Sequence, residues 1–459
     1  MNSLNDKEIL ATEKISKLFV KLSIPAVLAQ IINLLYNLID RIYIGHIKDI
    51  GTEALTGVGV CLPIIIFISA FSCLCGMGGA PKAAIKMGEG KKDEASIILG
   101  NCFTLTITLS IILTIIFLIF GEDLLMLFGA SENTLSYALD YIQTYTAGTI
   151  FVMIALGLNM FITTQGFSKV SMINVIIGAV CNIILDPLFI FGFNLGVKGA
   201  AIATIISQAL SSFFVLKFLF SKKTILKISF ENMKIKWNLL LPCIALGISP
   251  FIMQATESIL TICFNTSLQK YQGDLAVGSM TILTSLMQFA MLPLQGFTQG
   301  AQPIISYNYG AKNALRVKKA FKILLLTCLT YSFVFWLLIM IVPQFFVHLF
   351  TNDDSLLQYT VWALRIYMAV LGIFGIQIAC QQTFISLGNA PISLFLALLR
   401  KVILLIPLIY IVPHFTTNKC LGVFLAEPIA DTIAVATTAI LFYFIFKKTT
   451  QKMDQASLA

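Results

Sequence analysis

The sequence predicts an all-α polytopic membrane protein with twelve transmembrane helices, arranged as two pseudo-symmetric six-helix lobes. Three observations predict this fold. First, the 459 residues are 58% hydrophobic and only 12% charged, which is about half the charged fraction of a soluble protein. Second, many apolar runs exceed the roughly 20 residues that a helix needs to cross a bilayer. Third, the chain repeats itself with a constant offset that covers six runs.

The predicted spans follow the apolar runs of the sequence. They cover residues 18–44, 54–80, 96–120, 137–165, 171–193, 199–220, 239–264, 276–302, 321–343, 357–387, 392–411 and 421–446. Four prolines, Pro25, Pro63, Pro250 and Pro293, lie inside or at the start of spans. We expect them to kink these helices and not to end them, because neighbouring helices can satisfy the carbonyl groups that a proline frees.

Lysine and arginine residues predict the orientation of the spans. They cluster in residues 7–21, 82–92, 222–236, 312–319 and 447–452, whereas the loops on the opposite side carry only isolated cations. Because cytoplasmic loops are enriched in Lys and Arg, both termini are predicted to be cytoplasmic. The net charge of +9 reflects this bias and implies no nucleic-acid partner.

The internal repeat divides the chain into two halves. Phe128-Gly-Ala-Ser-Glu132 matches Phe350-Thr-Asn-Asp-Asp354, and Thr164-Gln-Gly166 matches Ser386-Leu-Gly388, both with an offset of 222. The predicted lobes are residues 1–225 and 226–459, joined by the basic segment 221–238. An even number of spans in each half makes the repeat parallel, and such transporters bind substrate between the halves near the bilayer midplane.

Polar residues in the first span form one stripe. Asn33, Tyr36, Asn37 and Asp40 are spaced by three and four residues, so they share one face of a helix. A carboxylate in an apolar helix seldom faces lipid, and the stripe therefore predicts one wall of a polar cavity. The alternative is that Asp40 lies near the outer end of the helix and reaches water.

A second acidic group lies in the fifth span. Asn182 and Asp186 are four residues apart on one helix face, with Thr204 in the next span and Asn159 in the span before. With Asp40 they supply the oxygen ligands that suit a proton or a small hard cation. The alternative for Asp186 is a helix end at the outer surface, beside Pro187.

The acidic group is not duplicated by the repeat. Shifted by 222 residues or slightly fewer, Asn182 and Asp186 land in the apolar stretch 403–408. If the acids served only the fold, both halves would be expected to carry them. Their restriction to the first half favours an ion-handling role there.

The second half has polar residues of its own. Glu257 and Gln288 are candidates to line the cavity, and Glu427 and Asp431 form another pair four residues apart. Arg400 and Lys401 lie deep in the eleventh span. They could pair with a nearby acid, but the sequence does not determine which one. For Glu427 and Asp431, a helix start that faces outside water is as good an interpretation as a functional site.

Several motifs together resemble a known family. Asp40-Arg-Ile-Tyr-Ile-Gly-His46, Asn182-Ile-Ile-Leu-Asp-Pro-Leu188 and Leu195-Gly-Val-Lys-Gly-Ala-Ala-Ile-Ala-Thr204 resemble the first, fifth and sixth helices of multidrug and toxin extrusion (MATE) transporters. Gly88-Glu-Gly-Lys-Lys and Tyr309-Gly-Ala-Lys-Asn resemble the paired cytoplasmic loops of that family. The resemblance covers the whole chain and is closest to the MepA-like bacterial group.

The resemblance implies alternating access and export of organic cations in exchange for H⁺ or Na⁺, across the bacterial inner (cytoplasmic) membrane. It implies that Asp40, Asn182, Asp186 and Thr204 occupy cation-coupling positions, that Asn33, Tyr36 and Asn159 line the same lobe, and that Pro25 kinks the first helix. Asn33 stands where some members have Gln. We expect amphipathic organic cations such as dyes and biocides as substrates, with fluoroquinolones as further candidates. We expect no cofactor, and no metal site other than Na⁺ at the coupling residues. We also expect a monomer in the lipid bilayer without an obligate protein partner.

Three other classes are less consistent with the sequence. A lipid-linked precursor flippase of the same superfamily would need a strongly cationic cavity, whereas deep cations are few here. A passive channel would need rings of like residues or a selectivity loop, and neither is present in the sequence. An enzyme is disfavoured because there is no His-rich metal cluster and no Ser/Lys nucleophile pair.

Overall fold

The computed structural model describes residues 9–48 and 50–458, and this part of the chain contains helices but no strand. Ten helices are long and apolar enough to cross a membrane, and two further helix pairs would do so as bent spans, with bends of 61° and 49°. The predicted fold class, an all-α membrane protein of the twelve-span type, is therefore confirmed.

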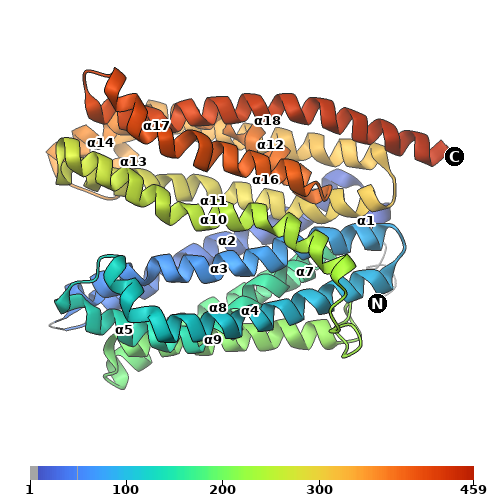
Figure 1. The fold of residues 1–459 in the computed structure, drawn as a ribbon, viewed down its shortest axis with the longest axis horizontal. Helices are drawn as coiled ribbons and strands as arrows, with labels where there is room; N and C mark the ends of the chain where they lie inside the picture. The colour runs from blue at the N-terminus through green and yellow to red at the C-terminus, as the bar shows by residue number, and fades with distance from the viewer. Residues whose placement is uncertain (1–8, 49, 459) are drawn as a thin grey trace.

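The first bundle contains the blue-to-green helices of Figure 1. Its elements are α1 (Ile9–Thr12), α2 (Ile15–Gly45), α3 (Gly51–Gly88), α4 (Lys92–Leu127), α5 (Glu132–Ala147), α6 (Thr149–Met153), the π-helical turn η2 (Ile154–Leu158), α7 (Asn159–Thr164), α8 (Ser168–Pro187), the π-helical turn η3 (Leu188–Gly192) and α9 (Gly196–Phe220). We call this bundle the first lobe.

The second bundle contains the yellow-green-to-red helices, and we call it the second lobe (Figure 1). Its elements are α10 (Trp237–Gln272), α11 (Asp274–Gly310), α12 (Ala314–Ile341), α13 (Pro343–His348), α14 (Asp354–Tyr367), α15 (Leu371–Ser386), α16 (Ala390–Leu398), the π-helical turn η4 (Leu399–Leu405), α17 (Ile406–Ile411), the 3₁₀ turn η5 (Val412–Phe415) and α18 (Lys419–Leu458).

The helices run further than the apolar stretches that predicted them. Helix α3 extends to Gly88 where the apolar run stops near residue 80, and α18 continues to Leu458 where the run stops near 446. Apolarity marks the part of a helix that lies in hydrocarbon, but intrahelical hydrogen bonds continue through polar residues beyond it. Pro25, Pro63, Pro250 and Pro293 all lie inside continuous helices, so none of them ends a span.

The two bends occupy equivalent positions in the two lobes. The first separates α5 from α6 at Gly148, and the second separates α14 from α15 at residues 368–370. These positions differ by about the repeat offset of 222. A side chain at Gly148 would collide with Ile205 of α9, so the first bend brings α5–α6 and α9 into close packing.

The lobes touch through glycine-rich faces at one end of the molecule. Side chains on Gly78 of α3 and Gly247 of α10 would each collide with the opposite helix, and Gly88 of α3 packs against the backbone of α11 at Tyr307. The lobes also touch between α11 and α2, where Gly300 of α11 packs against Ser23 of α2. The lobes are therefore closed at the end where both termini lie (Figure 1).

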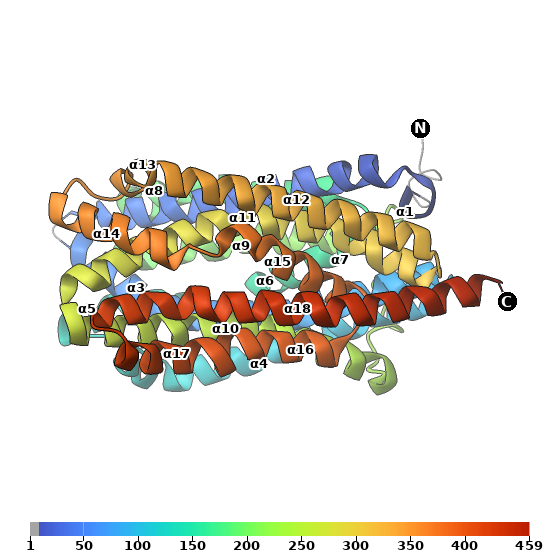
Figure 2. The same ribbon diagram turned by 90° about the horizontal axis from the view of Figure 1, so that it is seen from above.

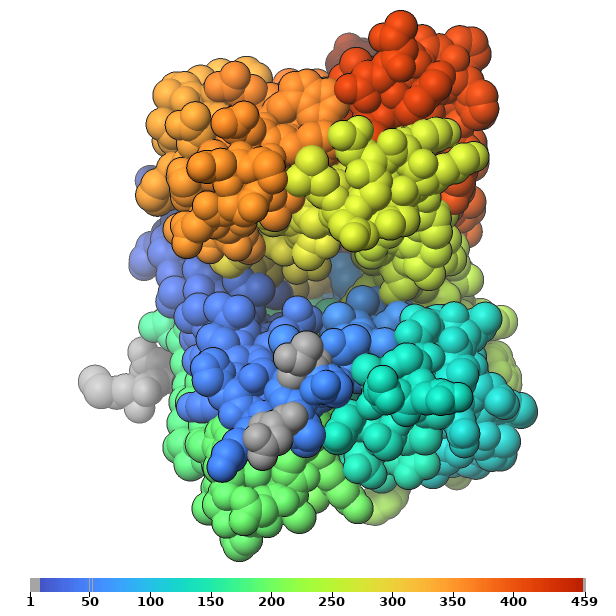
Figure 3. Space-filling model, turned by 90° about the vertical axis from the view of Figure 1, so that its left-hand side faces the viewer, coloured from blue at the N-terminus to red at the C-terminus, as the bar shows by residue number. Residues whose placement is uncertain are grey.

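The opposite end is open. Seen from that end, a deep recess separates the first lobe from the second (Figure 3). We call this recess the central cleft. The lobes also meet through an aromatic contact, in which the ring centroid of Phe71 of α3 lies 4.8 Å from that of Phe251 of α10. Close by, Cys73 Sγ donates to Gln254 Oε1 across the lobe interface, at 3.0 Å.

The segment that connects the lobes is bound to the first one. Gln165 Oε1 accepts hydrogen bonds from the backbone N–H groups of Ile225 and Leu226, at 2.7 and 2.8 Å. Asn101 Nδ2 donates to the carbonyl oxygens of Asn232 and Lys234, both at 2.9 Å. The basic segment 221–236 is thus held as part of the first lobe up to the start of α10.

Candidate ion and substrate sites

A buried acidic cluster lies in the first lobe between α2, α8 and α9. The Asp40 and Asp186 side chains lie against each other. Asn182 Nδ2 donates to Asp186 Oδ1 at 3.0 Å and to Thr204 Oγ1 at 3.3 Å. The structure therefore brings four of the predicted coupling residues, Asp40, Asn182, Asp186 and Thr204, to one place.

Burial decides between the two interpretations of these acids. Asp40 is 8% exposed and Asp186 is 0% exposed, so neither is a helix-end residue that reaches water. Each is held in the apolar interior of the lobe, where an ionised carboxylate is costly unless a cation compensates it.

Several oxygens of the acidic cluster lack a hydrogen-bond partner in the described part of the chain. They are Asp40 Oδ1, Asp186 Oδ2 and Asn182 Oδ1. Buried polar atoms are normally paired. Carboxylate, amide and hydroxyl oxygens are also the donor set that a proton or a small hard cation prefers. This set of atoms fits such an ion.

Tyr141 of α5 joins the acidic cluster without having been predicted as a site residue. It lies near Asp40, and the predicted Tyr36 of α2 lies near both carboxyl groups. The rings of Tyr141 and Tyr145 stack, with centroids 6.0 Å apart and an interplanar angle of 13°. Their spacing of four residues on a helix that enters the same lobe was the signal that could have identified them.

The remaining first-lobe candidates lie outside the acidic cluster. Asn37 is exposed, and its Nδ2 donates to the Asn33 carbonyl oxygen at 2.7 Å, within α2. Asn159 Nδ2 donates to the Ser171 carbonyl oxygen of α8 at 3.4 Å. Because Ser171 precedes Asn182 by eleven residues, about 16 Å along a helix, the structure does not bring Asn159 to the acidic group.

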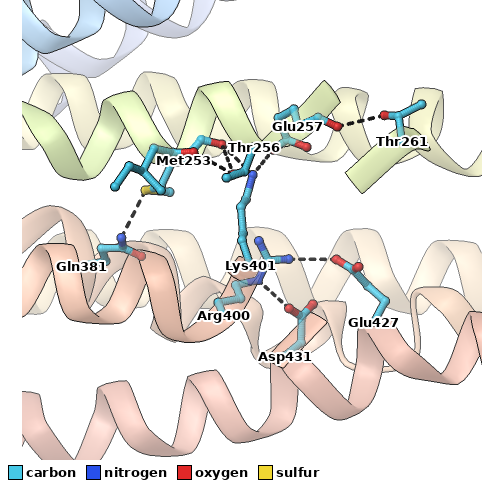
Figure 4. A network of polar contacts seen from close by, with 10 residues as sticks. Met253, Thr256, Glu257, Thr261, Gln381, Arg400, Lys401, Glu427 and Asp431 are labelled. Carbon is cyan, nitrogen blue, oxygen red and sulfur yellow. Dashed lines mark hydrogen bonds and ion pairs between the residues drawn. The ribbon is translucent and has the colours of Figure 1, made fainter. Parts of the chain in front are cut away.

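The second lobe contains a network of five charged residues (Figure 4). Arg400 donates through Nε to Asp431 Oδ1 at 2.6 Å and through Nη2 to Glu427 Oε1 at 2.9 Å. The guanidinium group also lies over the Phe374 ring, 4.5 Å from its centroid. Glu427 and Asp431 are 4% and 3% exposed, so the interpretation as a helix start facing water is wrong.

Lys401 links this network to α10. Its ammonium group donates to the Met253 carbonyl oxygen at 2.7 Å and forms an ion pair with Glu257 (Figure 4). The Lys401 side chain is 5% exposed, whereas the Glu257 side chain is 58% exposed. Glu257 is therefore the member of the charge network that a molecule from outside can reach. Gln288 of α11 is also exposed.

A small cavity lies between the lobes on the closed side of the cleft. It measures about 40 Å³ and is lined from the first lobe by residues that include Met77, Ala80 and Met160. With the repeat offset of 222 these positions correspond to Gln299, Gln302 and Gln382, which line it from the second lobe. The cavity is therefore lined by equivalent positions of the two lobes and lies on the pseudo-twofold axis that relates them. The first lobe contributes mainly apolar side chains, and the second contributes three glutamine side chains.

One inter-lobe hydrogen bond closes this axial cavity. Thr164 Oγ1 of the first lobe donates to Gln302 Oε1 of the second at 2.9 Å, and Gln302 Nε2 donates to Ser306 Oγ at 3.2 Å. A cavity of this size has room for water. The closed side of the cleft thus combines tight glycine packing with a polar contact at the axis.

Comparison with known proteins gives a consistent result across the chain. The family model named MatE matches residues 25–188 and 250–411. Over 457 residues, covering 99% of each chain, the sequence is 24% identical to a multidrug export protein MepA of Staphylococcus haemolyticus. Over 459 residues, again 99% of each chain, it is 25% identical to a protein of the same name from Staphylococcus saprophyticus.

The structure is similar to a solved structure described as a crystal structure of MATE in the bent conformation. The TM-score is 0.91 at 23% sequence identity, with 98% of this chain and 99% of that chain covered. At this identity the likeness establishes the fold.

Proposed function

Because the chain belongs to the MatE family, we propose that it is a multidrug efflux transporter that exports amphipathic organic cations in exchange for H⁺ or Na⁺. The family consists of transporters and not of enzymes. The relatives named above are multidrug export proteins, which supports the same activity here. Alternating access of the central cleft would carry the substrate across the membrane.

The observation that carries the ion-coupling part of the proposal is the acidic cluster of the first lobe. Two carboxyl groups lie against each other in an apolar interior, with unpaired oxygens around them. Two acids in contact cannot both stay ionised there without a cation. A coupling H⁺ or Na⁺ would supply that charge.

Coupling then requires that the ion prefer one access state. A ligand shifts an equilibrium between two conformations only by its differential affinity for them. The helices that hold the acidic cluster are α2 with Asp40, α8 with Asp186 and α9 with Thr204, and they belong to the lobe that must move against α10 and α11. We propose that ion binding at Asp40 and Asp186 changes the packing of α2 and so changes which side of the cleft is open.

The substrate class follows from the charges that border the cleft. The deep cations Arg400 and Lys401 are bound by three acids, of which Glu257 is exposed, so acids outnumber cations in this network. The polar side chains of Tyr36, Asn33, Asn37 and Gln288 are partly or fully exposed. Aromatic faces attract organic cations, and Phe71 and Phe251 meet between the lobes. A cleft of this kind favours cations over the pyrophosphate of a lipid-linked precursor.

The orientation is part of the proposal. The basic segments 82–92, 222–236 and 312–319 lie between helices whose ends gather with both termini at one end of the molecule (Figure 1). The positive-inside bias supports a cytoplasmic location for this end, in the bacterial inner membrane. The open side of the cleft would then face outward.

Ethidium transport in proteoliposomes tests the proposal. The purified chain is reconstituted, and a pH gradient and a Na⁺ gradient are imposed separately. We expect at least one gradient to drive ethidium movement against its concentration, and neither to do so in empty vesicles. Transport that is indifferent to both gradients, or confined to anionic compounds, would contradict the proposal.

A further inference from the structure

A groove of about 510 Å³ lies on the second lobe, between the bend that joins α14 to α15 and the neighbouring face of α18. It is on the side remote from the first lobe, where α14 and α18 lie side by side (Figure 2). Its lining is almost entirely apolar and includes Ile366, Ala369, Leu425, Ile429 and Ile433. The one charged residue in the lining is Arg365, which is exposed.

Arg365 carries a positive charge that the protein does not compensate. Its side chain makes no ion pair or hydrogen bond with the described part of the chain, residues 9–48 and 50–458. The two acids of α18 at this level, Glu427 and Asp431, point to the opposite side of the helix and are bound by Arg400. An unpaired charge within a membrane-spanning segment indicates a functional site by default.

The depth of Arg365 matches the boundary between hydrocarbon and head groups. Helices α14 and α15 run from Asp354 to Ser386 with a bend of 49° between them, so the pair spans about 45 Å by helix rise, whereas the hydrocarbon core is about 30 Å thick. With the pair centred in the bilayer, about 8 Å projects at each side. Arg365 lies about 16 Å from the first residue of α14, so its Cα is about 8 Å inside the hydrocarbon, roughly one arginine side chain from the boundary. A guanidinium group can extend from there to the head-group level.

We propose that this groove binds an anionic phospholipid of the surrounding bilayer, with its phosphate on Arg365 and one acyl chain along Ile366, Ile429 and Ile433. The guanidinium fork matches the oxygens of a phosphate and binds them through two parallel hydrogen bonds. The rest of the lining is apolar except for Thr432, and the Thr432 hydroxyl already donates its hydrogen to the Pro428 carbonyl oxygen of its own helix. Arg365 is therefore the side chain of the lining that would bind the phosphate.

The test is lipid retention by the purified full-length chain, measured by native mass spectrometry. The protein is titrated separately with dioleoylphosphatidylglycerol and dioleoylphosphatidylcholine. We expect one phosphatidylglycerol to be retained more tightly than phosphatidylcholine, and Arg365→Gln to weaken that binding by about tenfold. Lys198→Gln is the matched control, because it removes an exposed cation at the same end of the molecule but outside the groove.

A second variant tests the apolar part of the groove and keeps Arg365. Ile429→Trp fills the channel for the acyl chain and is expected to reduce retention of phosphatidylglycerol while the melting temperature in lipid-free detergent stays unchanged. If Arg365→Gln fails to fold, this variant decides the question. Equal retention of the two lipids by the wild type overturns the proposal. So does wild-type retention in both variants, or displacement of the lipid by inorganic phosphate.

Discussion

The two lobes bury acids in opposite ways. In the first lobe, Asp40 and Asp186 lie together with no ion pair to a basic side chain, and some of their oxygens are unpaired in the described chain. In the second lobe, Glu427 and Asp431 are equally buried, but Arg400 donates to both. In the described chain, the buried acids of the second lobe therefore have a basic partner and those of the first lobe do not, which is why the proposed function assigns the coupling cation to the first lobe.

The contrast arises on a shared framework. Tyr145 of the first lobe and Tyr367 of the second are related by the repeat offset of 222, and both lie beside the polar group of their lobe. Tyr145 stacks on Tyr141 and lies near Tyr36, and Tyr367 lies near Glu427, Glu257 and Asp431. The two lobes share this tyrosine position but differ in the charged residues around it. A buried acid in a membrane helix can therefore be assigned to ion binding only when the structure shows whether a basic side chain is paired with it.

The largest expected effect comes from removing an acid that has no partner. Asp186→Asn and Asp40→Asn should each abolish ethidium efflux, because an amide can neither accept a proton as a carboxylate does nor supply the negative charge that balances Na⁺. Efflux is measured in cells at matched membrane expression. Asp123→Asn, at an exposed position of the same lobe, is the control and should transport normally. Full efflux in both first-lobe variants would break the comparison.

The next effect is on stability and concerns the second lobe. Arg400→Met leaves Glu427 and Asp431 buried without their cation, and removing one partner of a buried ion pair costs about 3–5 kcal/mol of unfolding free energy. We expect a clear fall in the melting temperature of the purified protein. The triple variant that also carries Glu427→Gln and Asp431→Asn should recover most of the loss. A destabilised triple variant would show that the network does more than balance charge.

A smaller effect is expected at the exposed end of the network. Glu257→Gln should weaken binding of an organic cation by up to about fivefold, as for the loss of one half-exposed charge pair, and should leave the dependence on H⁺ or Na⁺ intact. Asp186→Asn should do the reverse. Ligand binding is measured as a function of pH and Na⁺ concentration. If Glu257→Gln removes the ion dependence, the roles of the two lobes are assigned backwards.

The smallest expected effect is that of breaking an exposed ion pair, and it serves as the reference for the stability changes above. Lys318 and Asp454 form an ion pair at 2.9 Å with side chains 46% and 52% exposed. Lys318→Gln should change the free energy of unfolding by less than about 0.5 kcal/mol and should not change transport. A loss comparable to that of Arg400→Met would mean that melting temperature does not distinguish buried from exposed pairs in this protein.

The sequence was sufficient for features that depend on one helix at a time. Hydropathy located the spans, and spacing of four residues placed Asn182 and Asp186 on one face. The repeat also showed that this acidic group has no counterpart at 403–408. These features follow from helical periodicity and from the cost of polar groups in lipid, which are local properties of the chain.

The sequence could not supply the features that depend on how helices meet. Asn159 and Asp186 are both polar residues of neighbouring spans, yet their helices run antiparallel and place them far apart along the axis. The partners of Arg400 come from a helix that begins nineteen residues later and lies against α14 and η4. Such pairings are fixed by tertiary packing, for which a single sequence carries no direct signal.

The hydrogen bonds from Gln165 and Asn101 to the connecting segment determine where the chain passes from one lobe to the other. Because residues 224–236 are bound to the first lobe and α10 begins at Trp237, the covalent link between the lobes is the junction of Lys236 and Trp237. In the proposed alternating access, this junction would act as the hinge. It lies at the closed side, so a small rotation there would give a large displacement at the far end of α10.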